Sequence, residues 1–317
     1  MLGDTIMMTS KVLVFNLDFL VVAGGSGGVY STNSGGGAGG LRTSYGSTSG
    51  GGASAENSIE VTSGNSFTVT VGGGGPHLNA SNISSPSRGG NSVFGTVTSL
   101  GGGVSTLGND SNGIPWKQGG SGTGGSYGGT PAGPGTAGQG FAGGSLNGAP
   151  NYKVGGAGGA GSVGEDASGG SPYSGRSGNG GDGLAVNILG VSNALIASVG
   201  EIPGGSSDVF YGGGGGSGSD SYRSRSPGSG GIGGGGSGGY NSTGTSGIPN
   251  TGGGGGGGAN RPSNMNGGNG GSGVVILRYP STVSPTLNGL TESTGSPFTE
   301  GSDNITVITA GSGTITF

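Results

Sequence analysis

Apolar residues gather in five short segments of the chain, and long glycine-rich tracts separate these segments. Segments that are rich in β-branched or alternating apolar residues and bounded by glycine are typical of β-strands. The five predicted strand segments are Val12–Val22, Ser58–Val71, Leu184–Val199, Val274–Tyr279 and Ile305–Phe317. Since no segment combines helix caps with a sustained 3.6-residue apolar period, the pattern predicts an all-β fold with essentially no α-helix.

Three of these segments support finer predictions. On both sides of Ser63-Gly64-Asn65, apolar and polar residues alternate, which predicts a hairpin with one buried face. The spacing of apolar residues in Leu184–Val199 also fits a helix, but Gly190 and the β-branched residues favour two strands around a turn. The last segment predicts a closing hairpin about Ala310–Gly313.

Several of the glycine tracts between the strands keep glycine at every third position. Three residues per turn is the repeat of a polyproline-II helix, which makes no internal hydrogen bonds. Glycine at every third position leaves one edge of such a helix bare, so neighbouring backbones can approach and pair. The sequence therefore predicts packed, left-handed polyglycine-II helices on a β-sandwich-like strand framework. The clearest registers are Gly155/Gly158/Gly161/Gly164, Gly230/Gly233/Gly236/Gly239 and Gly267/Gly270/Gly273.

Composition sharpens this picture, because glycine supplies 92 of 317 residues and hydrophobic residues only 28%. Globular domains are about 45–50% apolar with glycine counted, or roughly 40% without it, so a side-chain core of normal size cannot be assembled here. A flexible Gly/Ser linker is the alternative, and the triplet register between buried-type strands argues against it. The net charge is −4 and no basic stripe is present, so we expect no nucleic-acid binding.

The apolar segment near the N-terminus resembles a signal peptide because Lys11 precedes it. Asn16 and Asp18 interrupt the segment, and it is too short to span a bilayer. We therefore interpret it as a strand and expect no membrane insertion. Cysteine is absent, which excludes disulfides and thiol chemistry.

Motifs for catalysis or cofactor binding are weak. A glycine match starting at Gly25 fails the dinucleotide pattern at Tyr30, and His77 is the only histidine. Glu165-Asp166 is the only adjacent acidic pair, and its Gly/Ser/Ala context predicts exposure. We therefore predict no enzyme activity and no cofactor.

Two stretches have some features of calcium loops. Residues 108–113 lack the spacing and closing Glu of an EF-hand loop, and residues 178–184 show a β-helix-like pattern only once. Asx turns explain both stretches, so we predict no metal site.

Four stretches carry a family resemblance: FLVVAGGSGG, GGGAGGLRTSYGSTSGGGAS, SFTVTVGGGG and GGSGVVILRYP. Together they resemble a glycine-rich domain of bacteriophage tail fibres and adhesins, common in viruses of marine bacteria, cyanophages included. The resemblance covers Val12 to Pro280 and implies a β framework with packed polyglycine-II helices and host-binding loops at the tip. The expected division is a docking segment (1–11), the glycine-rich domain (12–280) and a tail (281–317). The tail is expected to close the framework or to exchange with a neighbouring subunit.

The expected function is that of a non-enzymatic virion structural protein, a phage tail-fibre or receptor-binding component made in the host cytoplasm. Its expected partners are other virion proteins, further copies of itself in a trimer, and a host surface glycan or outer-membrane protein. The alternatives are a capsid decoration or head-fibre protein, an ice-binding protein and a bacterial surface adhesin. The candidate receptor contacts are Asn109, Asp110, Trp116, Tyr222, Arg223 and Arg225.

Overall fold

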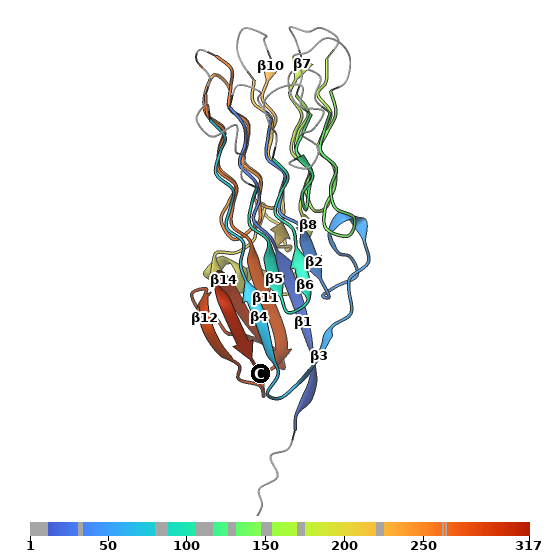
Figure 1. The fold of residues 1–317 in the computed structure, drawn as a ribbon, viewed down its shortest axis with the longest axis vertical. Coiled ribbons are helices and arrows are strands. Elements are labelled where there is room, and N and C mark those ends of the chain that lie inside the picture. Colours follow the sequence, from blue (N-terminus) through green and yellow to red (C-terminus); the bar gives the residue numbers. More distant parts are fainter. Residues whose placement is uncertain are drawn as a thin grey trace, which may run out of the picture.

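The computed structural model describes residues 12–30, 34–79, 88–104, 117–125, 131–146, 154–169, 175–219, 225–261, 263 and 265–317. The molecule is elongated, with a β framework at one end and a bundle of extended chains side by side at the other (Figure 1). The start of β1 (Val14–Val22) and the C-terminal Phe317 lie at the framework end, which we call the base. The all-β prediction is confirmed.

One antiparallel sheet forms the framework, in the order β2-β1-β11-β14-β4-β5-β6, with β3 beside β1 and with β12 and β13 beside β14. Its two ends approach each other, because Ser99 Oγ donates to Val21 O at 2.8 Å and Arg42 donates to Thr98 O at 3.4 Å. The sheet is therefore nearly closed. The bounds are β2 (Leu41–Thr43), β3 (Ile59–Thr62), β4 (Ser66–Thr70), β5 (Ser92–Phe94), β6 (Val97–Ser99), β11 (Val274–Pro280), β12 (Thr286–Glu292), β13 (Phe298–Glu300) and β14 (Asp303–Thr316).

Hydrogen bonds in the bundle repeat every three residues. Along residues 23–29, the N–H groups that donate to residues 34–40 are those of Ala23, Ser26 and Val29. Those that donate to residues 268–271 are Gly25 and Gly28. Each chain thus bonds to a different neighbour along each edge, which is the pairing that three-residue helices without internal hydrogen bonds permit. The predicted three-residue helices are confirmed.

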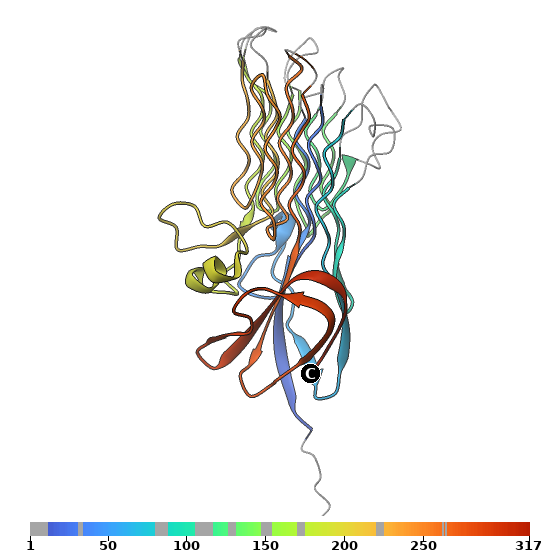
Figure 2. The same ribbon diagram turned by 90° about the vertical axis from the view of Figure 1, so that its left-hand side faces the viewer.

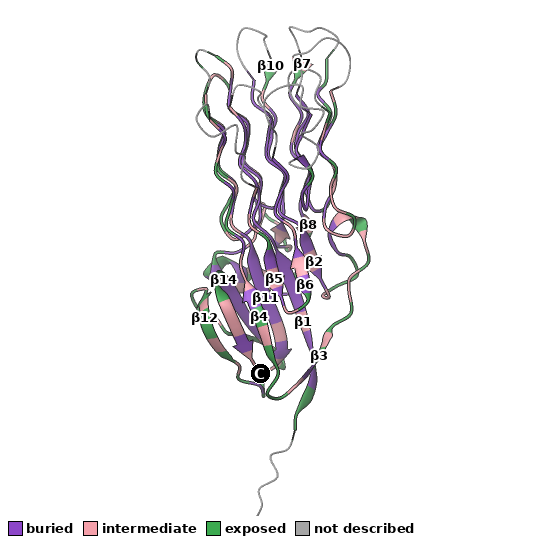
Figure 3. Ribbon diagram, viewed as in Figure 1, coloured by how far each residue is buried: buried purple, intermediate pink, exposed green. Residues whose placement is uncertain are grey.

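Bare helix edges allow this packing. A Cβ at Gly28 would lie 2.0 Å from the carbonyl oxygen of Gly256, far inside van der Waals contact. The inner chains of the bundle are buried along most of their length (Figure 3). Backbone pairing therefore replaces side-chain burial as the organising interaction in this half of the molecule.

The triplet register does not show where the chain reverses. The tract that contains Gly230 to Gly239 turns at residues 232–234, and Gly235 N and Gly238 N donate back to Gly231 O and Gly228 O. The tract from residue 155 to 164 likewise folds back at residues 160–162. Each of these two registers therefore spans two antiparallel helices.

Two apolar clusters pack on opposite faces of the central strands. Because strand side chains alternate, Phe19 and Val21 of β1 face the space that the nearly closed sheet encloses, whereas Leu20 and Val22 lie on its outer face. The outward cluster is covered by β8 (Leu184–Ala185), α2 (Val191–Ala197) and β9 (Phe210–Tyr211). The 3₁₀ turn η1 (Gly50–Gly52) follows β2.

The prediction of two strands within Leu184–Val199 is wrong in its second half, where the helix α2 forms. Ala194 and Ala197 bury against the outward cluster. Glu300 of β13 accepts hydrogen bonds from Gly190 N at 2.8 Å and from Asn193 Nδ2 at 2.7 Å. Tertiary contacts thus override the β preference of the branched residues.

Both predicted hairpins are also wrong, because their strands pair with other partners. β3 pairs with β1 and β4 pairs with β14, so the turn at residues 63–65 joins strands that do not pair together. β14 is assigned as one strand, antiparallel to β11 in its first half and to β4 in its second. Since β11 leads away from the bundle and β4 leads into it, β14 bends back near Gly311, where φ is 108° (Figure 2).

Candidate functional site

The described residues that flank the internal gaps lie toward the end of the bundle farthest from the sheet, which we call the distal end (Figure 1). β7 (Gly175–Arg176) and β10 (Arg225–Ser226) lie there and pair in parallel. On another side of the bundle, Val29, Leu78 and Val104 form a small buried apolar cluster with Tyr30 packed against it. The distal end therefore has its own side-chain contacts in addition to the backbone array.

Of the predicted receptor contacts, Arg225 falls within the described residues. It lies in β10 and its backbone is paired with Gly175 of β7, which places it at the distal end. Five of the predicted contacts lie outside the described residues: Asn109, Asp110, Trp116, Tyr222 and Arg223.

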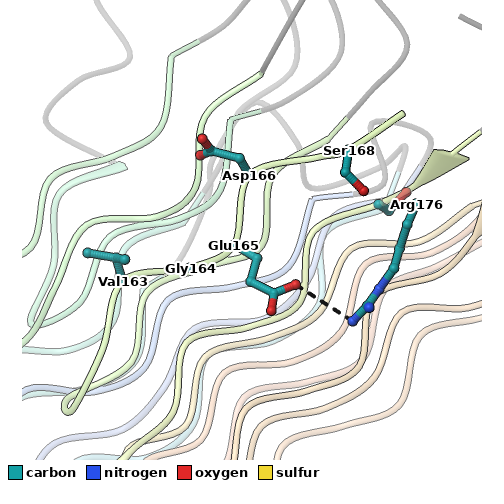
Figure 4. A pocket seen from close by; sticks show the side chains of 7 residues that line it. Val163, Gly164, Glu165, Asp166, Ser168 and Arg176 are labelled. Carbon is teal, nitrogen blue, oxygen red and sulfur yellow. Dashed lines mark ion pairs between the residues drawn. The ribbon is translucent and has the colours of Figure 1, made fainter. Parts of the chain in front are cut away.

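An open cavity of about 380 Å³ lies beside β7 (Figure 4). One wall of the cavity follows the three-residue repeat. Gly164 and Ala167 are buried, so the side chains of the residues between and after them face outward. Glu165 points toward Arg176 in the close-up view. The lining residues are Val163, Gly164, Glu165, Asp166, Ser168, Arg176 and Ser177.

The charged groups of this cavity sit on a fixed backbone. Ser168 and Arg176 exchange two backbone hydrogen bonds of 3.0 Å each, and Asp166 Oδ1 accepts from Ser145 N at 2.6 Å. Glu165 Oε2 and Arg176 Nη2 are 3.6 Å apart, with side chains that are 58% and 46% exposed. At this distance and exposure the ion pair adds little stability, so both groups are accessible to a ligand.

The sequence predicted that Glu165 and Asp166 are exposed, and this prediction is confirmed. The sequence analysis did not single out Arg176, which belongs to a different extended segment of the bundle. The glycine register carries part of the missing signal, because residues three apart, such as Glu165 and Ser168, share an edge of a three-residue helix. The glycine register does not predict which segment of the bundle lies beside that edge.

Polar side chains of the stretch 178–184 accept hydrogen bonds from the backbone of a neighbouring three-residue helix. Asn179 Oδ1 accepts from Ser229 N at 2.8 Å, and Asp182 Oδ1 accepts from Ile232 N at 2.9 Å. These bonds satisfy backbone donors at the edge of the array, so the Asx-turn interpretation of this stretch is wrong. The stretch 108–113 lies outside the described residues.

Other titratable groups have structural partners. His77 Nδ1 lies 2.9 Å from Asn269 Oδ1 on the bundle. In the framework, Tyr279 Oη lies 2.6 Å from Thr306 Oγ1 beside a cavity of about 130 Å³, and burial raises the pKa of the Tyr279 hydroxyl. Within the described ranges, no three histidine or acidic side chains gather where they could hold a metal ion. No helix in the same ranges has the length and apolarity to cross a membrane.

A nearly closed β framework that carries a hydrogen-bonded bundle of three-residue glycine helices defines the class of this protein. The model of a family described as a glycine-rich domain matches residues 3–280. The chain therefore belongs to this glycine-rich domain family. No curated protein and no solved structure matches the chain. The matched region contains the whole bundle, and β12, β13 and β14 follow it.

Proposed function

We propose that this protein is a non-enzymatic virion structural protein, a bacteriophage tail-fibre or receptor-binding component whose distal end contacts the host cell surface. One observation carries the proposal: the two ends of the molecule differ from each other. Both described chain ends, near Val12 and Phe317, lie at the base, whereas the described residues that flank the internal gaps lie toward the distal end. Such a molecule can attach by one end and present the other.

The physical properties of the bundle support this role. Its helices are cross-linked by backbone hydrogen bonds on several edges, so the bundle behaves as a stiff support. Binding residues are commonly placed on loops that a rigid scaffold positions, because such loops vary without disturbing the fold. A preorganised support also lowers the entropy cost of binding.

The base offers a surface for attachment to other virion proteins. Val12, Leu13 and Val14 are 64%, 38% and 53% exposed at the start of β1. Apolar side chains on a projecting strand are suited to docking on a partner. We propose that this end joins the particle and that copies of the chain associate there as a trimer.

Adsorption measurements test the proposal. Fluorescently labelled purified protein is expected to bind host cells and to reduce phage adsorption in a concentration-dependent way. Trp116→Ala and Arg225→Ala are expected to weaken binding, whereas Glu60→Gln, an exposed change in β3 at the base, serves as the matched control. Protein that neither binds host cells nor competes with the phage would contradict the proposal.

A capsid decoration or head-fibre protein is the alternative, because an elongated molecule with an apolar base can equally attach to a capsid by that base. Antibody labelling of virions in electron micrographs separates the two functions. Label on the tail supports the receptor-binding component, and label on the head supports the alternative.

A further inference from the structure

The cavity beside β7 has walls that do not need to rearrange when a ligand binds. One wall is residues 163–168 and the other is β7, and the bonds between Ser168 and Arg176 join them. Because these backbones are bonded into the array, the side chains project from fixed positions (Figure 4). Fixed positions reduce the ordering cost of recognition.

The side chains offer complementary hydrogen-bonding groups. An ionised Glu165 only accepts, Arg176 only donates, and Ser168 does both. Glu165 and Arg176 approach to 3.6 Å and are both about half exposed. Two neighbouring hydroxyl groups of a sugar fit such a pair, because one hydroxyl donates to the carboxylate while the next accepts from the guanidinium. Hydrogen bonds to charged groups are the stronger kind.

Charge and geometry argue against an ionic ligand. The cavity lining contains two carboxylates, of Glu165 and Asp166, and one guanidinium, of Arg176, so its charge does not favour an anion. The two carboxylates belong to adjacent residues of a three-residue helix and therefore point to different edges, so they do not converge on a cation. The volume of about 380 Å³ suits a small molecule.

We propose that this cavity binds a neutral hexose through adjacent hydroxyl groups, with Glu165 and Arg176 as the principal contacts and Ser168 beside them. The proposed function enters only as the source of the sugar, which would be a polysaccharide of the host surface. The cavity then adds a second contact to those of the distal loops.

Saturation-transfer NMR on the full chain tests the site with three probes, the methyl α-glycosides of glucose, mannose and galactose, in buffer with and without EDTA. At least one glycoside is expected to bind. The double variant Glu165→Gln/Arg176→Met is expected to weaken that binding about tenfold or more, because it removes two charge-assisted contacts. Glu60→Gln repeats the Glu→Gln half of this variant at the base and is expected to leave binding unchanged.

Three results would overturn the site: no binding of any of the three glycosides, binding that survives the double variant, or binding that EDTA abolishes, which would indicate a cation site. Adsorption to host cells with no glycoside binding would contradict the sugar site alone. Glycoside binding without adsorption would instead contradict the proposed function.

Discussion

Glycine residues in the bundle differ in what occupies the space next to their Cα atoms. At Gly28 a Cβ would meet the carbonyl carbon and oxygen of Gly256, at 2.5 and 2.0 Å, and backbone in a packed array cannot move aside easily. At Gly73 a Cβ would meet no atom within 4 Å. Close approach of a neighbouring backbone, not flexibility, therefore explains glycine at the interior positions.

This difference predicts opposite effects of the same substitution. Gly28→Ala is expected to lower the free energy of unfolding by about 2 kcal/mol or more, because the added methyl group overpacks the array. Gly73→Ala is the matched control and is expected to change stability by less than about 1 kcal/mol, with a slight gain from the less flexible unfolded chain. Thermal and denaturant unfolding measure both. Equal effects at the two positions would contradict the packing account.

At the scale of elements, the local pattern of residues predicted the elements whose signals lie within one segment. It did not predict strand pairing or the helix, which depend on partners distant in the sequence. The strands β1 and β11 and the three-residue helices were predictable, because their signals lie within each segment. The pairing of β14 with β11 and β4, and the helix α2, depend on residues far along the chain. Of the residues at the distal end, Arg225 was a predicted receptor contact, and that role stays a prediction. Arg176 was missed because only the bundle brings it beside Glu165.

The contact between β13 and α2 gives an element-scale prediction. Glu300 accepts hydrogen bonds at the start of α2 and also contacts Arg278 Nη1 at 3.4 Å. Glu300→Ala is expected to destabilise the protein by about 1–3 kcal/mol, because it leaves partly buried donors unsatisfied. Unfolding by guanidinium chloride, compared with the exposed control Glu60→Ala, measures the effect. Equal stability of the two variants would show that Glu300 does not support the helix.

At the scale of the whole molecule, the tail that follows the family-matched region completes the framework. β14 lies between β11 and β4, and the tail supplies Ile305 and Val307 to the outward cluster and Phe317 to the inward one. Phe317 packs against the rings of Phe15, Phe67 and Tyr279 at centroid distances of 5.8, 6.1 and 5.4 Å. The bundle therefore rests on a framework whose nearly closed sheet is formed within one chain.

Removal of residues 281–317 is expected to abolish the soluble, folded protein, because it exposes both clusters and leaves edges of β11 and β4 unpaired. The milder Phe317→Ala is expected to cost about 3 kcal/mol or more. Size-exclusion chromatography of the truncated chain and unfolding of the point variant measure these effects. A truncated chain that elutes as a single folded species, monomer or trimer, would contradict the assigned role of β14.

The claim that the glycine tracts form a hydrogen-bonded support, and not a flexible linker, underlies both the fold and the proposed function. Amide hydrogen exchange by NMR tests it residue by residue, because exchange reports the opening of individual hydrogen bonds. Slow exchange is expected at Gly25, Gly28 and Gly255, whose N–H groups donate to neighbouring backbones at 3.0, 2.8 and 2.9 Å. Fast exchange at all three, at the rate of an unstructured chain, would contradict it.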